Sequence, residues 1–199
     1  MKRIDRGEIL GLADYETIRE PFRARVIAEK RARRFSVGPK ASAVFENHDT
    51  VLLQIQEMLR IERITRPSSI QHEIDTYNEL VPDEDELSCT LMVEIDGKAE
   101  RDAFLQAAKG LEKHIWLVAG GERVPARTAE RWADAAADRT TALHYLKFAL
   151  PKGVARALRA HEPPGEIALE IDHPAYEARA TLRPDTVAAL GEDLEAPDE

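Results

Sequence analysis

The chain has 199 residues, of which 43% are hydrophobic and 33% are charged, and its formal net charge at pH 7 is −9. This length and composition are typical of a globular domain and exclude an intrinsically disordered chain. The negative net charge repels phosphate backbones and anionic lipid, so we expect neither a nucleic-acid-binding protein nor a membrane-surface protein.

Cysteine usage and the N-terminal segment indicate the cellular setting. Cys89 is the only cysteine, so the chain can form no internal disulfide and no cysteine-ligated iron–sulfur cluster. Met1 is followed directly by charged residues, and no stretch reaches the roughly 18 apolar residues that cross a bilayer. We therefore expect a cytoplasmic protein. The sequence identifies no cofactor and leaves a metal site built from histidines and carboxylates open.

The first half of the chain has the pattern of a mainly helical region. Asp5 and Glu8 have the spacing of a capping box, and so do Ser68 and Gln71. Pro21 suits the first turn of a helix, so a new helix is expected to begin there. The predicted elements are a short helix over 14–20, a basic helix over 22–34, a hairpin over 35–45, and helices over 50–64 and 68–80.

Alternating residues and turn dipeptides predict mainly strands in the second half. Gly120 and Gly121 separate two strand-like runs, which predicts a hairpin over 115–127. The other predicted elements are a strand over 87–95, a helix over 96–110, a strand over 142–150, a helix over 151–160 and a strand pair over 167–182.

The distribution of these elements predicts the fold class. Helices cluster early and hairpins late, so we expect an α+β fold with a mainly antiparallel sheet and helices packed on one side. We see no internal repeat and no linker, which predicts a single domain over residues 1–191. Residues 192–199 are acidic and contain a proline, so they are expected to form a flexible tail.

The predicted helix over 50–64 carries the densest polar pattern. Gln56, Arg60 and Arg63 occupy positions i, i+4 and i+7, so they lie on one strip of a helix. A guanidinium matches the oxygens of a carboxylate or phosphate, which makes this strip a candidate site for an anion or a partner subunit. The simpler interpretation is a salt bridge within the chain or at a dimer interface, with Glu57 pairing to Arg60.

Glu62 falls within the apolar stripe of the same helix. Its helical angle places it among four apolar residues, namely Val51, Ile55, Met58 and Leu59. Because an isolated buried charge costs several kcal/mol to desolvate, we predict that Glu62 is buried and has a partner. That partner is either an arginine or a metal ion.

Two histidines are candidate metal ligands. His144 shares a predicted strand face with apolar neighbours, and His173 lies in a predicted hairpin connection. Together with Glu57 and Glu62 they supply nitrogen and oxygen ligands, although no spacing among the four is diagnostic. The alternative for His144 is an ordinary buried, hydrogen-bonded residue, and for His173 a side chain that is free at a sheet edge.

Six segments of the chain are distinctive: FRARVIAEKRARR, FENHDTVLLQIQEMLRIERI, IQHEIDTYNELVPD, WLVAGGERV, ALHYLKF and IDHPAY. In this order, and over nearly the whole chain, they resemble a bacterial family known as domain of unknown function 3501. The resemblance implies one domain and no particular chemistry, because no activity is established for the family. It also implies a setting, since members look like companions of rubrerythrin-type diiron proteins and of iron–sulfur oxidoreductase subunits.

Two functional hypotheses follow. The first is an accessory or binding protein in a bacterial redox or peroxide-detoxification system, with a rubrerythrin-type or iron–sulfur protein as its partner. The alternative is a metal-dependent enzyme that uses Glu57 or Glu62 with His144 and His173. The sequence leaves open whether the chain is an enzyme. A homodimer is one of the assemblies that we consider.

Overall fold

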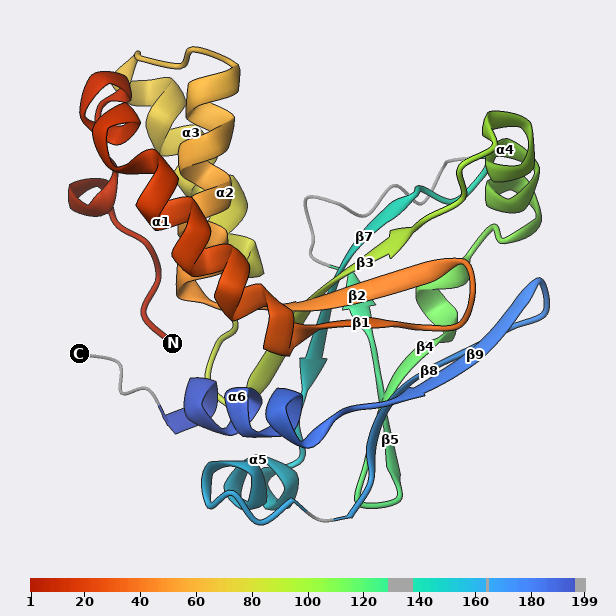
Figure 1. Ribbon diagram of the computed structural model, residues 1–199. Helices are drawn as coiled ribbons and strands as arrows, with labels where there is room; N and C mark the ends of the chain where they lie inside the picture. The colour runs from red at the N-terminus through yellow and green to blue at the C-terminus, as the bar shows by residue number, and fades with distance from the viewer. Residues whose placement is uncertain (129–137, 164, 196–199) are drawn as a thin grey trace.

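The computed structural model of the chain describes residues 1–128, 138–163 and 165–195. Two antiparallel sheets lie against each other, and a layer of three helices lies beside the first sheet (Figure 1). Most of the alanine-rich acidic segment that follows Arg127, and the last four residues of the expected tail, lie outside the described residues.

The helical layer consists of α1 (Leu12–Arg33), α2 (His48–Ile61) and α3 (Pro67–Tyr77). The 3-10 turn η1 (Arg6–Glu8) precedes it, and η2 (Asn78–Leu80) follows it. The prediction that a new helix begins at Pro21 is wrong, because α1 runs straight through this residue. A proline inside a helix removes one backbone hydrogen bond. Contacts with α2 hold the helix on both sides of the proline, from Arg19 to Glu57 and from Arg25 to Asp49.

One of the two predicted capping boxes is present. The Asp5 side chain accepts from the Gly7 amide, and the Glu8 carboxylate accepts from the Asp5 amide, as the spacing predicts. The box predicted at Ser68 does not form. The helix α3 begins one residue earlier, at Pro67, and has no side-chain cap. Proline at this first position already has a helical φ angle and needs no amide partner.

The first sheet, sheet A, has the strand order β1-β2-β3-β7-β6. Its strands are β1 (Arg34–Ser36), β2 (Ala41–Glu46), β3 (Glu86–Val93), β7 (Leu143–Ala149) and β6 (Arg127–Thr128). All of its pairings are antiparallel. One face packs on the helical layer, where Tyr145 of β7 joins an apolar cluster that includes Val51 and Ile55 of α2.

The second sheet, sheet B, has the strand order β5-β4-β8-β9. Its strands are β4 (Ile115–Ala119), β5 (Glu122–Pro125), β8 (Ile167–His173) and β9 (Tyr176–Thr181). The predicted hairpin forms between β4 and β5. Gly120 and Gly121 both have positive φ, at 59° and 83°, which suits the tight turn and is unfavourable for other residues.

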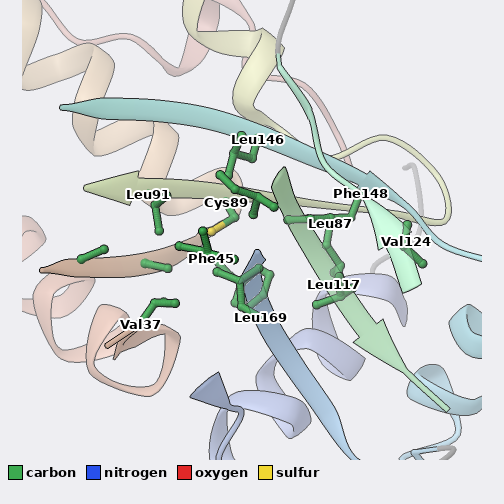
Figure 2. Close-up of a cluster of buried hydrophobic side chains, with 14 of the residues drawn as sticks. Val37, Phe45, Leu87, Cys89, Leu91, Leu117, Val124, Leu146, Phe148 and Leu169 are labelled. Carbon is green, nitrogen blue, oxygen red and sulfur yellow. The ribbon is translucent and has the colours of Figure 1, made fainter. Parts of the chain in front are cut away.

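The main core lies between the two sheets. Leu87 and Phe45 of sheet A point toward Leu117 and Leu169 of sheet B, and Cys89 lies among them (Figure 2). All five side chains are buried. Because side chains alternate along a strand, the neighbours of Leu117 and Leu169 point to the opposite, outer face of sheet B.

The other helices pack against this core. They are α4 (Lys98–Ala107), followed by η3 (Leu111–His114), then α5 (Lys152–Arg159) and α6 (Pro184–Glu195). Helix α6 includes residues 192–195, which the sequence assigns to a flexible tail. They are helical because Asp193 bonds to the buried Arg33 of α1 and the Leu194 carbonyl accepts from Arg159.

The structure confirms the predicted α+β class, with antiparallel strands and a helical layer on one side of a sheet. The sequence did not indicate that the strands divide into two sheets. Within the described part of the chain, no helix is long and apolar enough to span a membrane.

Candidate functional site

The strip predicted from Gln56, Arg60 and Arg63 does not form a single exposed surface. Gln56 is only 2% exposed, and its side-chain oxygen accepts from the Leu10 amide at 2.7 Å. Arg60 lies at the surface and pairs with Glu16 of α1 at 3.1 Å. Arg63 lies beyond the end of α2, where its positive φ of 53° takes the chain out of the helix. The three side chains therefore have three different surroundings.

Glu57 joins α1 to α2. Its carboxylate accepts two hydrogen bonds from Arg19, at 2.8 and 3.0 Å, and one from the buried Tyr15 hydroxyl at 2.8 Å. The hydrogen bonds from Arg19 lower the pKa of Glu57. Both oxygens of this carboxylate have partners within the chain, and Arg19 takes the place that the sequence assigned to Arg60.

The predicted burial of Glu62 is wrong, because its side chain is exposed. The helix ends at Ile61, and Glu62 forms its C-terminal cap. The buried face of the helix is also rotated from the predicted one. Leu53 and Gln56 are buried, whereas Met58 is only half-buried. The exposed carboxylate needs neither an arginine nor a metal partner.

His144 is buried as predicted and is bonded to a hydroxyl. Its Nε2 lies 3.3 Å from the Thr140 hydroxyl, and burial lowers the pKa of its ring. His173 is 7% exposed. Its Nδ1 accepts from the Ala175 amide at 3.1 Å, so its Nε2 is the atom that donates to the Lys109 carbonyl, also at 3.1 Å. Both nitrogens of His173 are therefore occupied, which fixes the tautomer of the neutral ring.

The four candidate metal ligands do not form a site. In the part of the chain that the structure describes, no three histidine, cysteine, aspartate or glutamate side chains are grouped to hold a metal ion. Glu57 is bonded to α1, Glu62 faces solvent, and each histidine has a partner of its own.

A different group of polar residues gathers on the outer face of sheet B. We call it the Asp172 cluster, and its members are His114, Trp116, Arg123, Glu170 and Asp172. Trp116 of β4 lies directly opposite Glu170 of β8, and Asp172 is two residues further along the same face. Arg123 comes from β5 and His114 from the end of η3. The cluster is therefore built from three neighbouring strands of sheet B and the short helix η3.

Asp172 is the centre of this cluster. One carboxylate oxygen accepts from the Trp116 indole at 3.0 Å and lies 3.2 Å from His114 Nδ1, and the other accepts from Arg123 at 2.7 Å. The hydrogen bond from Arg123, followed by that from Trp116, lowers the pKa of Asp172 to about 2. Asp172 is therefore ionised at neutral pH and orients its three partners.

Arg123 stacks on Trp116 in this cluster, and the side chains of Arg123, His114 and Asp172 are 42%, 41% and 38% exposed. The guanidinium carbon of Arg123 lies 4.4 Å from the centroid of the Trp116 ring, and the group also bonds to Glu170 at 2.7 Å. The His114 ring packs edge-on against His173 with 4.9 Å between centroids, so the fixed His173 supports it. The arrangement holds an aromatic face and a guanidinium rigidly at the surface, and rigid groups of these types suit recognition of another molecule.

No sequence motif marks the Asp172 cluster. His114 lies at the end of an element, and no motif joins it to Trp116 or Asp172. The signal that was present is alternation, because Glu170 and Asp172 are two residues apart on one strand and Trp116 alternates with apolar neighbours. That signal places each residue on an outer face and does not show which strands are adjacent.

A cavity of about 250 Å³ lies between the acidic turn before β3 and the end of α6. Carboxylates of Asp83, Asp85 and Glu86 line it, but each has a basic partner. These pairs are Arg3 with Asp83, Arg159 with Asp85 and Lys147 with Glu86, at 3.0, 2.5 and 2.6 Å. These three carboxylates join segments of the chain, so we assign no ligand to this cavity.

Comparisons with known proteins agree with this architecture. The chain matches the model of a family described as protein of unknown function, DUF3501, over residues 3–194. It is also similar to the crystal structure of a novel protein of unknown function from Burkholderia pseudomallei K96243. The TM-score is 0.88 at 35% identity, and the match covers 96% of this chain and 98% of that chain. No curated protein matches. The chain therefore belongs to the DUF3501 family.

Proposed function

We propose that this chain is an accessory binding protein that docks a partner protein through the outer face of sheet B. The observation that carries this proposal is the stack of Arg123 on Trp116, held in place by Asp172. Tryptophan and arginine are the residues most enriched among those that dominate binding energy at protein interfaces. Side chains lose conformational entropy when a partner immobilises them. The bonds to Asp172 already restrict Trp116 and Arg123 in the free chain, so less entropy remains to be lost on binding.

The position of the cluster supports docking of a protein rather than of a small molecule. A small ligand needs a concave site, whereas the Asp172 cluster lies on the face of a sheet that carries side chains of both charges. Antiparallel sheets commonly leave one such face uncovered. The two sheets bury the inner face of sheet B in the core, which leaves its outer face for a partner.

The family resemblance suggests the class of partner. Rubrerythrin-type diiron proteins and iron–sulfur oxidoreductase subunits are the candidates, and the chain would act beside them in the cytoplasm without carrying the electrons itself. The rival hypothesis of a metal-dependent enzyme loses support, because its four ligands are occupied or apart. The docking proposal needs no cofactor within this chain.

Binding to purified candidate partners tests the proposal. We expect a rubrerythrin-type protein or an iron–sulfur oxidoreductase subunit from the same organism to bind the immobilised chain. Trp116→Ala and Arg123→Ala should each weaken this binding by about tenfold or more, since loss of a dominant interface residue costs about 2 kcal/mol or more and about 1.4 kcal/mol corresponds to tenfold. Arg25→Ala is the matched control, because Arg25 is an exposed arginine of the helical layer with a carboxylate partner.

Two results would contradict the proposal. If a partner binds and both sheet B variants bind it as tightly as the wild type does, the Asp172 cluster is not the docking surface. If neither class of partner binds the wild-type chain, the redox association is wrong.

A further inference from the structure

The strand β9 forms an open edge of sheet B. Among the described strands, it pairs with β8 and with no other. The Leu182 amide donates to the Ile167 carbonyl at 2.8 Å, at the end of this ladder. Because hydrogen-bonded pairs alternate along an antiparallel ladder, Ala178 and Ala180 direct their amides toward β8. Glu177, Arg179 and Thr181 direct theirs toward the free edge.

The free edge of β9 lacks the features that normally prevent strands from pairing. Proteins protect their edges with short strands, prolines, lysines or charges that point inward. The other described edges have such protection, since β1 has three residues, β6 has two, and β5 ends in Pro125. In contrast, β9 has six residues, YEARAT, with neither proline nor lysine, and its inward-facing residues are Tyr176, Ala178 and Ala180.

We propose that β9 is an interface at which two copies of this chain pair edge to edge in antiparallel orientation. The charges on the strand select the register. If Glu177 of one copy lies opposite the partner's Arg179, the twofold axis repeats this pair, and two complementary pairs flank Ala178. Both residues direct their amides and carbonyls toward the free edge, so the same register also forms the backbone hydrogen bonds.

Other registers are less favourable. A shift by one residue would place Ala178 opposite a residue of the partner whose amide faces the free edge. The Ala178 amide already bonds to β8, so this register loses backbone hydrogen bonds between the copies. A shift by two residues would place Arg179 opposite the partner's Arg179, or Glu177 opposite the partner's Glu177. Like charges directly opposite each other are destabilising.

The two side chains are available for this contact. Glu177 is exposed, and no partner for its side chain lies among the described residues. Arg179 is 41% exposed, and its two terminal nitrogens bond to Glu166 at 2.8 Å and Glu170 at 2.6 Å. Both carboxylates lie on the β8 side of Arg179, and the five N–H donors of the guanidinium allow a further carboxylate to bind.

Pairing at β9 would join two four-stranded sheets into one continuous eight-stranded sheet. The Asp172 cluster would stay on the outer face of each copy, because edge pairing covers a strand edge and leaves the face uncovered. The inference is therefore independent of the proposed docking of a partner, and either can fail without the other.

Sedimentation equilibrium of the full chain, from low micromolar to millimolar concentration, tests the pairing. We expect the wild type to form a dimer as concentration rises. Glu177→Arg should weaken the dimer by about tenfold or more, because it turns two complementary pairs into two repulsive ones. Glu177→Pro should do the same by removing a free-edge amide, and it removes no hydrogen bond to β8. Glu122→Arg, on the opposite edge of sheet B, is the control with the same charge change.

Amide hydrogen exchange gives a second measurement that needs no variant. In the dimer, the amides of Glu177 and Arg179 should be protected, and this protection should disappear on dilution to the monomer. A wild type that stays monomeric at all concentrations overturns the proposal. So does a dimer that either Glu177 variant retains at wild-type affinity, or one in which these two amides exchange freely.

Discussion

Arg33 at the end of α1 and Asp193 near the end of α6 form a buried ion pair between residues 160 positions apart in the chain. The guanidinium donates two hydrogen bonds to the carboxylate, one of them at 2.8 Å. The side chains are only 4% and 9% exposed. This contact attaches the C-terminal helix to the helical layer.

Removal of this carboxylate should strongly destabilise the fold. Asp193→Ala leaves the buried guanidinium of Arg33 without its main partner, which we expect to lower the free energy of unfolding by about 3 kcal/mol. Urea denaturation measures the change. Glu192→Ala, at the exposed neighbouring position of the same helix, is the control and should change stability by less than about 0.5 kcal/mol. Equal effects of the two substitutions would show that the ion pair contributes nothing.

The contact between α5 and α6 requires a glycine. A Cβ atom added at Gly191 of α6 would lie 2.6 Å from the Leu158 carbonyl oxygen of α5, so the two helices would have to separate. Gly191→Ala should therefore lower the free energy of unfolding by about 1–3 kcal/mol. Gly153→Ala on α5 is the matched control, because a Cβ atom there meets nothing within 4 Å. That substitution should be neutral or stabilise by up to about 1 kcal/mol through helix propensity. The order of the two melting temperatures checks the prediction.

His48 should make the attachment of the N-terminal segment depend on pH. Its Nε2 lies 2.9 Å from Glu8 of η1, and its Nδ1 lies 3.2 Å from Asp49, which also pairs with Arg25. The bond to Asp49, followed by the charge of Glu8, raises the pKa of His48. A histidine pKa that is higher in the folded state adds stability below the unfolded value of about 6.5, and this stability is lost as pH rises through the folded value.

The stability of His48→Gln relative to the wild type, measured by urea denaturation across this range, tests the effect. We expect the largest loss near pH 5, where the wild-type imidazolium is fully charged and Asp49, with its pKa lowered to about 2, is ionised. The loss should shrink above neutral pH. A difference that is the same at every pH would show that the charge of His48 makes no contribution.

Cys89 should be unreactive in the folded protein. Its thiol is completely buried between the two sheets, and burial raises the pKa of this group, so the reactive thiolate is not populated. A disulfide reagent that reports free thiols should release no product from the native chain and one equivalent after unfolding in urea. Rapid reaction under native conditions would mean that the sheets separate readily at this position.

Local patterns in the sequence were enough to determine the fold class and most of the elements, although they divided α1 at Pro21 and did not predict α6. The amphipathic stretch before Ile61 and the Gly120–Gly121 turn depend on interactions between near neighbours, so one sequence specifies them. The burial of His144 also followed from strand alternation alone. The family match rests on the same sequence, through segments that lie in all parts of the chain.

Tertiary structure alone decided where the polar residues of α2 lie. Gln56 is buried because Leu10, far away in the sequence, supplies its hydrogen bonds, and Glu62 is exposed because the helix stops before it. A small error in the predicted phase or end point of a helix is therefore enough to assign an exposed residue to the buried face, or a buried residue to the exposed face. These details depend on which surface packs against the helix, and periodicity does not specify that surface.

The Asp172 cluster and the β9 edge were also decided by tertiary structure. Trp116, Arg123 and Asp172 meet because β5, β4 and β8 are neighbours in sheet B, and β9 is an edge because no described strand follows it. Strand order depends on pairings between distant segments, whose contributions are spread over many weak contacts and are not encoded in any short motif. The sequence by itself therefore determined which residues form strands, whereas the packing of the whole chain determined which of them meet.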